Sequence, residues 1–255
     1  MSHISNTLFI GKVLLRYNSL NSTNLAAQQL LAQQNKPIEG TTIVAEEQTE
    51  GKGQRGNAWQ SPSGQNLLSS FILYPKHLLP KQQFNLNIIA SLAVIDLLQE
   101  VGVTNAVIKW PNDIYINDNK VAGILIQNNI AGTQIASTIV GIGLNVNQTT
   151  FDPNLPNPTS LQNELNQIID TEALLMQLCA TLEKRYLQYK SKRGMEDMLS
   201  DYTAQMYRFG EVAQYLINGQ SQPGIIKGID EHGKLLLQMG GSIRAFEFQG
   251  LRFIV

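Results

Sequence analysis

The chain has 255 residues, enough for one large domain or for one domain with a small appendage. Its 19 Lys and Arg residues against 20 Asp and Glu residues give a net charge of −1, which argues against a protein that mainly coats nucleic acid or an acidic membrane. With 43% hydrophobic residues and so little net charge, the composition also excludes an intrinsically disordered chain.

The N-terminal part of the chain is predicted to alternate helices with strands. Ser22-Thr23-Asn24 precedes a run of helix formers and predicts the capped start of a helix over 25–32. β-Branched and apolar runs predict strands over 41–45 and 66–74, separated by a polar, glycine-rich loop. Apolar residues at three- and four-residue intervals then predict a helix over 81–101.

The segment that follows is predicted to be rich in strands. Strands over 107–110 and 113–116 flank a Pro-Asn pair, and an Asn-Asp-Asn turn leads into a strand over 120–126, which predicts a hairpin. Another strand is expected over 135–146. The segment 152–158 is expected to be irregular, because its three prolines remove backbone donors.

A long helix over 171–190 is predicted next, and it carries the single cysteine, Cys179. One cysteine excludes an intramolecular disulfide framework and a zinc site built on cysteines. Its apolar neighbours predict a buried side chain and not a nucleophile. The N-terminal residues lack the basic region and apolar core of a secretory signal, and the most apolar helix is too short to cross a bilayer, so we expect a cytoplasmic protein.

The character of the sequence changes near residue 209. Short β-like runs over 212–217, 225–229, 235–237 and 243–248 alternate with glycine turns. A module of roughly 45 residues is too small to form a stable hydrophobic core of its own, so it should pack on the larger part of the chain. The sequence therefore predicts an α+β fold, with a larger domain over 1–208 and a small all-β domain over 209–255.

The loop after the second strand is the first motif with chemical content. Gly51, Gly53 and Gly56 allow backbone N–H groups to approach a ligand, and Lys52 and Arg55 add positive charge. Together they predict an anion cradle. The loop is neither a Walker A motif nor a Rossmann fingerprint, because it leads into a strand. The alternative is a mobile surface loop with incidental charge.

A second motif is Lys109-Trp110-Pro111-Asn112-Asp113. Lys109 emerges from an apolar strand and could place its charge against a phosphate or a developing negative charge. Alternatively it could extend to water at the strand end, or pair with Asp113.

Other candidate motifs are weaker. The tripeptide at 22–24 is either a helix cap or, with Gln48, a set of neutral donors and acceptors for a small polar group. The Gly-x-Gly at 141–143 is a weak nucleotide motif, common at bulges. The three histidines are scattered, so we expect no transition-metal site.

In this order, the motifs resemble the biotin protein ligase family. The resemblance is carried by six segments: Ser-Thr-Asn at 22–24, the glycine loop preceded by Gln48 and followed by Trp59, the Lys-Trp-Pro-Asn-Asp pentapeptide at 109–113, Lys-Val-Ala-Gly-Ile-Leu at 120–125, Gly-Ile-Gly-Leu-Asn-Val-Asn at 141–147 and Thr-Ser-Leu at 159–161. The resemblance runs from about Leu15 to the C-terminus. It implies a mixed sheet flanked by helices, as in class II synthetase-like catalytic domains, and an SH3-like C-terminal β-barrel.

The resemblance implies ATP-dependent activation of biotin to biotinyl-5′-AMP, followed by transfer to a lysine of a biotin carboxyl carrier protein such as that of acetyl-CoA carboxylase. Mg²⁺ is implied with ATP, with no carboxylate cage visible in the sequence. Catalysis is assigned to Lys109 and Arg55. Substrate binding is assigned to Ser22, Thr23, Asn24, Gln48, Gly51, Lys52, Gly53, Gln54, Gly56, Trp59, Lys109, Asn112, Lys120, Gly123 and Asn145.

Two departures from the family pattern carry expectations. Gln54 replaces a charge that helps retain the adenylate in other members, so faster adenylate release is expected. About 15 residues precede the resemblance, too few for the helix-turn-helix domain of some members, so we expect a monofunctional ligase without DNA binding. We expect no membrane partner, and the sequence leaves open whether the protein is a monomer or a homodimer.

The sequence leaves three alternative functions open. A lipoate ligase or octanoyltransferase shares the architecture, and choice between biotin and lipoate would distinguish it. A non-catalytic sensor of biotin or its adenylate would regulate through contacts instead of turnover. A structural α+β protein without a ligand would leave the two cationic motifs unexplained.

Overall fold

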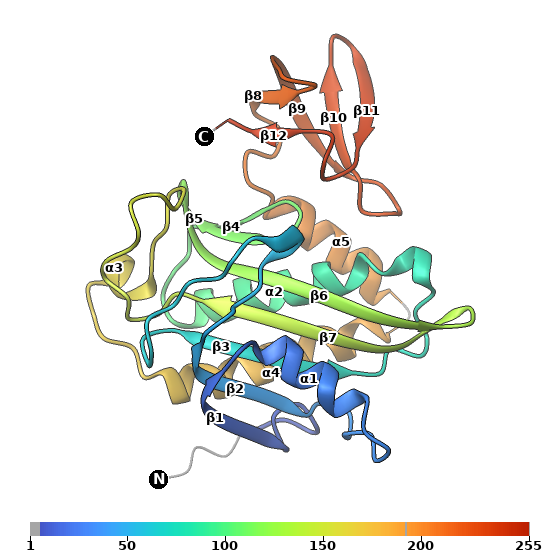
Figure 1. Cartoon of the computed structure of the whole chain (residues 1–255). Coiled ribbons are helices and arrows are strands. Elements are labelled where there is room, and N and C mark those ends of the chain that lie inside the picture. The colour runs from blue at the N-terminus through green and yellow to red at the C-terminus, as the bar shows by residue number, and fades with distance from the viewer. Residues whose placement is uncertain (1–5, 192, 255) are drawn as a thin grey trace.

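The computed structural model describes residues 6–191 and 193–254, apart from the side chain of Arg55. Its larger sheet has seven strands in the order β1-β2-β3-β7-β6-β5-β4 (Figure 1). β1 runs parallel to β2 and the other neighbours are antiparallel, so the sheet is mixed, as predicted. The strands are β1 (Leu14–Leu20), β2 (Thr42–Gln48), β3 (Leu67–Leu73), β4 (Ala106–Lys109), β5 (Asp113–Ile116), β6 (Asn119–Ala131) and β7 (Gln134–Leu144).

Helices cover both faces of this sheet. In Figure 1, α1 lies in front of the sheet, whereas α2, α4 and α5 lie behind it. Helix α2 is apolar around most of its circumference, because it is enclosed by the sheet, α4 and α5. The helices are α1 (Thr23–Leu31), α2 (Asn85–Glu100), α3 (Leu161–Leu165), α4 (Thr171–Tyr189) and α5 (Gly194–Ala204), with short 3₁₀ turns η1 (Gln54–Gly56) and η2 (Pro80–Gln82).

The C-terminal residues form a second sheet, drawn at the top of Figure 1, with five antiparallel strands in the order β11-β10-β9-β8-β12. The strands are β8 (Val212–Ile217), β9 (Gln220–Ile229), β10 (Leu235–Met239), β11 (Ser242–Phe246) and β12 (Arg252–Phe253). This architecture agrees with the predicted SH3-like module. Its buried residues, such as Tyr215 and Leu235, belong to the same apolar cluster as those of α2 and α4, so the module packs on the larger part as expected.

The structure confirms the predicted helices and strands and adds further elements, including the five-residue helix α3. Strand β1 was missed because its central residues are polar and exposed, so its sequence lacks an apolar alternation. Helix α5 and the two-residue strand β12 were also missed. Cys179 is fully buried, as predicted. The division of the chain into domains at residues 208 and 209 stays a prediction.

Of the helices in the described residues, none combines the length and the hydropathy that crossing a bilayer requires.

Candidate active site

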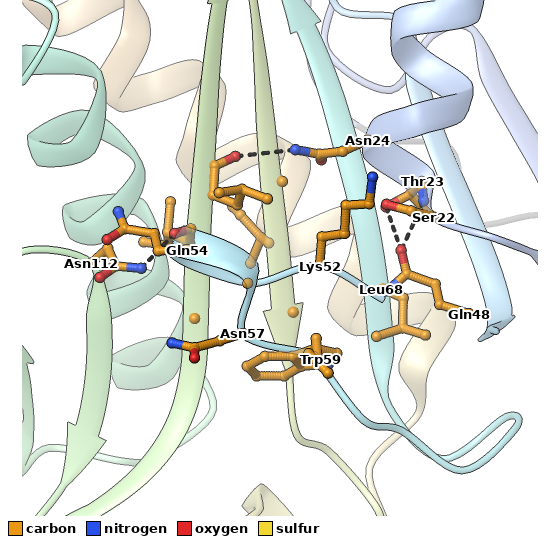
Figure 2. A pocket seen from close by; sticks show the side chains of 18 of the residues that line it. Ser22, Thr23, Asn24, Gln48, Lys52, Gln54, Asn57, Trp59, Leu68 and Asn112 are labelled. Atoms are coloured by element: carbon orange, nitrogen blue, oxygen red, sulfur yellow. Dashed lines mark hydrogen bonds between the residues drawn. The ribbon is translucent and has the colours of Figure 1, made fainter. Parts of the chain in front are cut away.

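A cavity of about 120 Å³ lies between the start of α1, the glycine loop and strands β6 and β7 (Figure 2). The segments that surround it are far apart in the sequence. Its lining residues are Ser22, Thr23, Asn24, Gln48, Lys52, Gly53, Gln54, Asn57, Ala58, Trp59, Leu68, Ser69, Asn112, Asp113, Lys120, Gly123, Ile124, Leu125, Gly141, Ile142, Gly143 and Phe248.

One end of the cavity is polar and uncharged. The backbone N–H and the hydroxyl of Thr23 donate to Gln48 Oε1, at 2.8 and 3.1 Å (Figure 2). Asn24 Nδ2 donates to Gln127 Oε1 at 2.9 Å, and its Oδ1 accepts from the buried Ser70 hydroxyl at 2.6 Å. The side chains of Gln48 and Asn24, which line the cavity, are therefore held in fixed orientations.

Ser22 occupies the N-cap position of α1, but its side chain makes no capping hydrogen bond. The Gln48 amide oxygen instead accepts from Thr23 N–H in the first turn of the helix. Since Ser22 lines the cavity, this local geometry favours the ligand-binding interpretation of the 22–24 tripeptide over the helix-cap interpretation.

Three glycines on the central strands allow side chains to lie directly on the sheet. A Cβ atom on Gly141 would come within 2.2 Å of Asn24 Oδ1. A Cβ atom on Gly143 would come within 2.5 Å of the Trp59 ring, and one on Gly123 within 2.9 Å. The Gly-x-Gly at 141–143, a weak motif in the sequence, therefore forms the floor of the cavity because any side chain there would displace Asn24 or Trp59.

The two lysines of the sequence motifs have different environments. Lys120 lines the cavity, where its Nζ lies 2.6 Å from Asp113 Oδ1 and 5.6 Å from the centroid of the Trp59 ring. Lys109 is absent from the described lining residues. Its Nζ donates to the Tyr115 hydroxyl at 2.8 Å and lies 5.5 Å from the centroid of the Phe253 ring.

The prediction that Lys109 bridges two substrates is not tested by this geometry and stays a prediction. Its β4 strand is separated from β6 by β5, and its side chain is taken up by aromatic groups. Burial lowers the pKa of the Lys109 ammonium, with a smaller opposing effect from Asp113. Asp113, which the sequence offered as a partner for Lys109, pairs with Lys120 instead.

A second cavity of about 370 Å³ adjoins the first. The two share Asn57, Ala58, Trp59 and Lys120, and Lys120 is the charged residue that lines both. The rest of the second wall is largely apolar. Leu155, Pro156 and Pro158 come from the segment predicted to be irregular and Phe151 immediately precedes it, and Gln60 and Asn145 complete the wall. Asn145 therefore lies beside the second cavity, where its Nδ2 donates to the Thr159 carbonyl at 2.9 Å.

The glycine loop is folded onto the cavity. Gly53 N–H donates to the Asn57 carbonyl at 2.7 Å, which closes the turn around η1. Gly51 and Gly56 do not line the cavity in the described structure, but both shape the loop. A Cβ atom on Gly51 would meet the Trp59 carbonyl oxygen at 2.3 Å, and Gly56 has a φ of +81°. The side chain of Arg55 lies outside the described residues, so its assignment stays a prediction.

Several lining or supporting residues were missed by sequence reasoning. Ser70 and Gln127 orient Asn24 but lie in strands whose sequence looks purely structural. Phe248 comes from the loop between β11 and β12, so the C-terminal sheet contributes to the cavity wall. A lone phenylalanine in a short β-rich segment carries no sequence signal for such a role.

The described residues offer no protein cage for a metal ion. They contain no group of three or more His, Cys, Asp or Glu side chains placed to hold one. Asp113 is the carboxylate among the described lining residues, and it is paired with Lys120. Mg²⁺ in nucleotide sites is held largely by phosphates and water, which would be compatible with such a sparse set of donors.

Comparisons with known proteins give a consistent assignment. Residues 17–145 match the model of the biotin/lipoate A/B protein ligase family. The chain is 34% identical to the bifunctional ligase/repressor BirA of Bacillus subtilis (strain 168) over 242 residues, which cover 93% of this chain and 73% of that protein. It is 32% identical to the biotin–[acetyl-CoA-carboxylase] ligase of Paracoccus denitrificans over 203 residues, 77% of this chain and 83% of that one.

Solved structures agree with this assignment. The biotin protein ligase of Aquifex aeolicus in complex with biotin and ATP matches with a TM-score of 0.78 and 26% identity, over 94% of this chain and 98% of that chain. From the family match across half of its length and from these relatives, the chain belongs to the biotin/lipoate A/B protein ligase family.

Proposed function

We propose that this protein is a biotin protein ligase, which activates biotin with ATP and transfers it to a lysine of a biotin carboxyl carrier protein. The observation that carries the proposal is the pair of adjoining cavities that share Lys120 and Trp59. One cavity has a polar, uncharged end and the other has an apolar wall, so two chemically different substrates can meet at one ammonium group.

The polar end of the first cavity suits the ureido group of biotin. Such a group is neutral and carries both donors and acceptors, as do Ser22, Asn24 and Gln48. The glycine floor and the Trp59 ring leave a narrow space for the thiophane ring and the acyl chain. Lipoate, whose dithiolane ring is apolar, would leave these polar groups unpaired, at a cost in binding free energy.

Lys120, which lines both cavities, is proposed to act on the reacting groups. A carboxylate oxygen of biotin attacks the α-phosphorus of ATP, the bond to the β-phosphate oxygen breaks, and pyrophosphate leaves. The Lys120 ammonium reduces the repulsion between the carboxylate and the phosphate and stabilises the negative charge that develops. Asp113, 2.6 Å from Lys120 Nζ, holds that ammonium in position.

The second half-reaction uses the same site. The amine of the carrier lysine attacks the acyl carbon of biotinyl-5′-AMP, the bond from that carbon to the phosphate oxygen breaks, and AMP leaves. The amine loses its proton as the amide forms. Lys52, Gln54 and the backbone of the glycine loop, which line the first cavity, are proposed to cover the adenylate and to exclude water until the carrier arrives.

The direct test is to mix the protein with ATP, Mg²⁺, biotin and an apo carrier domain and to measure the mass of the carrier. We expect a mass gain of one biotinyl group that depends on ATP and on the carrier lysine. Lipoate in place of biotin should give no gain. Transfer of lipoate, or no transfer of either acid, would contradict the proposal.

The proposal extends to location and partners. We propose a cytoplasmic enzyme, since the reaction needs ATP and an apo carrier. The near-neutral charge supports the absence of operator binding, although some relatives are named ligase/repressors. A salt-sensitive gel shift on specific DNA would contradict this. Strand β1 lies at an edge of the large sheet, which supports association of two copies through that edge, and light scattering would measure it.

A further inference from the structure

The C-terminal sheet reaches the first cavity through one aromatic residue. Phe248, in the loop that follows β11, lines the cavity together with Asn112 and Asp113 of the larger part. The other described lining residues lie between positions 22 and 143. The wall that Phe248 forms is therefore completed only when the C-terminal sheet is seated on the larger sheet.

Trp110 is placed to hold the C-terminal sheet in this position on the larger sheet. Its side chain is 4% exposed, and its indole Nε1 donates to the Gly233 carbonyl in the β9–β10 turn at 2.9 Å. The Trp110 ring also packs edge-on against Phe248, with 5.8 Å between the ring centroids. Trp110 is absent from the described residues that line either cavity, although it stands in the middle of the 109–113 motif.

The turn that receives this hydrogen bond is fixed from the opposite side. Gly233 has a φ of +82°, and a Cβ atom there would lie 2.0 Å from Cγ of Phe84, the residue that precedes α2. The Asp230 carboxylate accepts from the backbone N–H groups of His232 and Lys234, both at 2.9 Å, and so shapes the turn. The turn is thus held between the start of α2 and Trp110.

From this arrangement, and resting on the proposed function, we propose that Phe248 is a wall of the adenylate site that keeps water from the activated acyl group, and that Trp110 is the positioning residue that holds Phe248 there. When the wall is lost, water attacks the acyl carbon of biotinyl-5′-AMP and the bond to the phosphate oxygen breaks. Biotin and AMP then leave without transfer to a carrier. The polar end that binds the ureido group lies in other segments and is unaffected.

The test uses Phe248→Ala, Trp110→Phe and the double variant in the full chain, with AMP release measured in the presence of biotin and ATP but without a carrier. Phe248→Ala should release AMP several-fold faster than the wild type, while the Kd for biotin stays unchanged. Trp110→Phe removes the N–H donor and keeps an aromatic ring. A neutral hydrogen bond contributes about 0.5–1.5 kcal/mol, so this variant should show a rise of about two- to tenfold.

If Trp110 acts through Phe248, the two changes are not independent. The double variant should therefore release AMP no faster than Phe248→Ala, whereas independent effects would multiply. Phe209→Ala is the matched control, because it removes the same side chain from the C-terminal region at a position that lines neither cavity. Its carrier-independent AMP release should equal that of the wild type.

The outcomes separate the two proposals. A wild-type protein that makes no adenylate from biotin and ATP contradicts the proposed function. A wild type that makes it, with Phe248→Ala or Trp110→Phe indistinguishable from Phe209→Ala, contradicts this inference alone, and so do multiplying effects in the double variant. Thermal melts check that each variant folds. If Trp110→Phe does not fold, AMP release is compared across the wild type, Phe248→Leu and Phe248→Ala. Equal rates of carrier-independent AMP release in these three proteins would also overturn the inference.

Discussion

At the scale of single residues, two lysines near one edge of the large sheet have different surroundings. Lys120 lies at the start of β6 and lines both cavities, whereas Lys109 ends β4 and contacts Tyr115 and Phe253. Lys109 begins the motif at 109–113 and Lys120 begins the motif at 120–125, so the sequence indicates a functional role for both lysines equally. Strand β5 lies between them. Lys109 is paired with Asp113 and Lys120 with Tyr115 in the strand register, but Lys109 Nζ contacts the Tyr115 hydroxyl and Lys120 Nζ contacts the Asp113 carboxylate.

This difference gives a prediction for adenylate formation. Lys120→Ala removes the charge between the two proposed substrates and should slow pyrophosphate release by about 10²–10³-fold, as loss of a preorganised charge-stabilising donor does. Lys109→Ala tests in parallel the sequence-based assignment of catalysis to Lys109. Pyrophosphate release with biotin and ATP measures both. A larger loss of rate in Lys109→Ala than in Lys120→Ala would support the sequence-based assignment of catalysis to Lys109.

A second prediction at this scale concerns Cys179. Burial raises the pKa of its thiol from the ordinary 9.0 to about 12. The native protein should therefore resist iodoacetamide at pH 8, and the unfolded protein should react. Because the raised pKa favours the native state only while the thiol stays protonated, this contribution is lost as the pH rises from 9 towards 12. Native labelling at the unfolded rate would contradict burial of the thiol.

At the scale of elements, strands β6 and β7 carry the floor of the cavity. Their apolar pattern was predicted from the sequence, as was the hairpin turn before β6, where Asn117 has a φ of +55°. The purpose of Gly123, Gly141 and Gly143 in these strands was not predictable. The sequence does not distinguish a strand glycine that marks a bulge from one that allows a distant side chain to approach closely.

Gly143→Ala tests the floor. The new methyl group would overlap the Trp59 ring, so Trp59 must move into the cavity or away from the sheet. We expect biotin to bind at least tenfold more weakly, which corresponds to about 1.4 kcal/mol. Isothermal titration measures this change. Gly132→Ala, in the turn between the same two strands with open space around it, should leave the biotin Kd unchanged even if its positive φ lowers stability.

At the scale of the whole molecule, residues near the N-terminus are tied to a helix from the second half of the chain. The Glu183 carboxylate on α4 is 6% exposed and accepts from the backbone N–H groups of Leu8, Phe9 and Ile10, at 2.6, 2.7 and 2.9 Å. This contact lies outside both cavities and connects segments 173 to 175 residues apart.

Glu183→Gln should therefore affect stability and not activity. It exchanges charge-assisted hydrogen bonds for weaker ones and leaves a buried N–H group with a poorer partner, which costs about 1–3 kcal/mol. Urea denaturation followed by tryptophan fluorescence measures the free energy of unfolding. Biotin transfer at a temperature where the variant is folded should match the wild type. An unchanged midpoint would show that the three bonds are dispensable.

The sequence by itself determined most of the helices and strands in their order, apart from β1, α3, α5 and β12, and it determined the α+β class, the small C-terminal β module and the segments that make the site. Such features follow from local periodicity, turn residues and contiguous motifs, all of which are written along the chain. The glycine loop, the segment at 22–24 and the strands at 120–125 and 141–144 do meet at one cavity.

The tertiary structure alone decided which lysine faces that cavity, which helix-start residue is free to bind, and which residue the C-terminal sheet contributes. Each of these depends on strand register, on side-chain direction or on contacts between segments more than a hundred residues apart, such as Trp110 with Gly233. A local pattern carries no information on those distances, because they are fixed by how the sheets and helices pack as a whole.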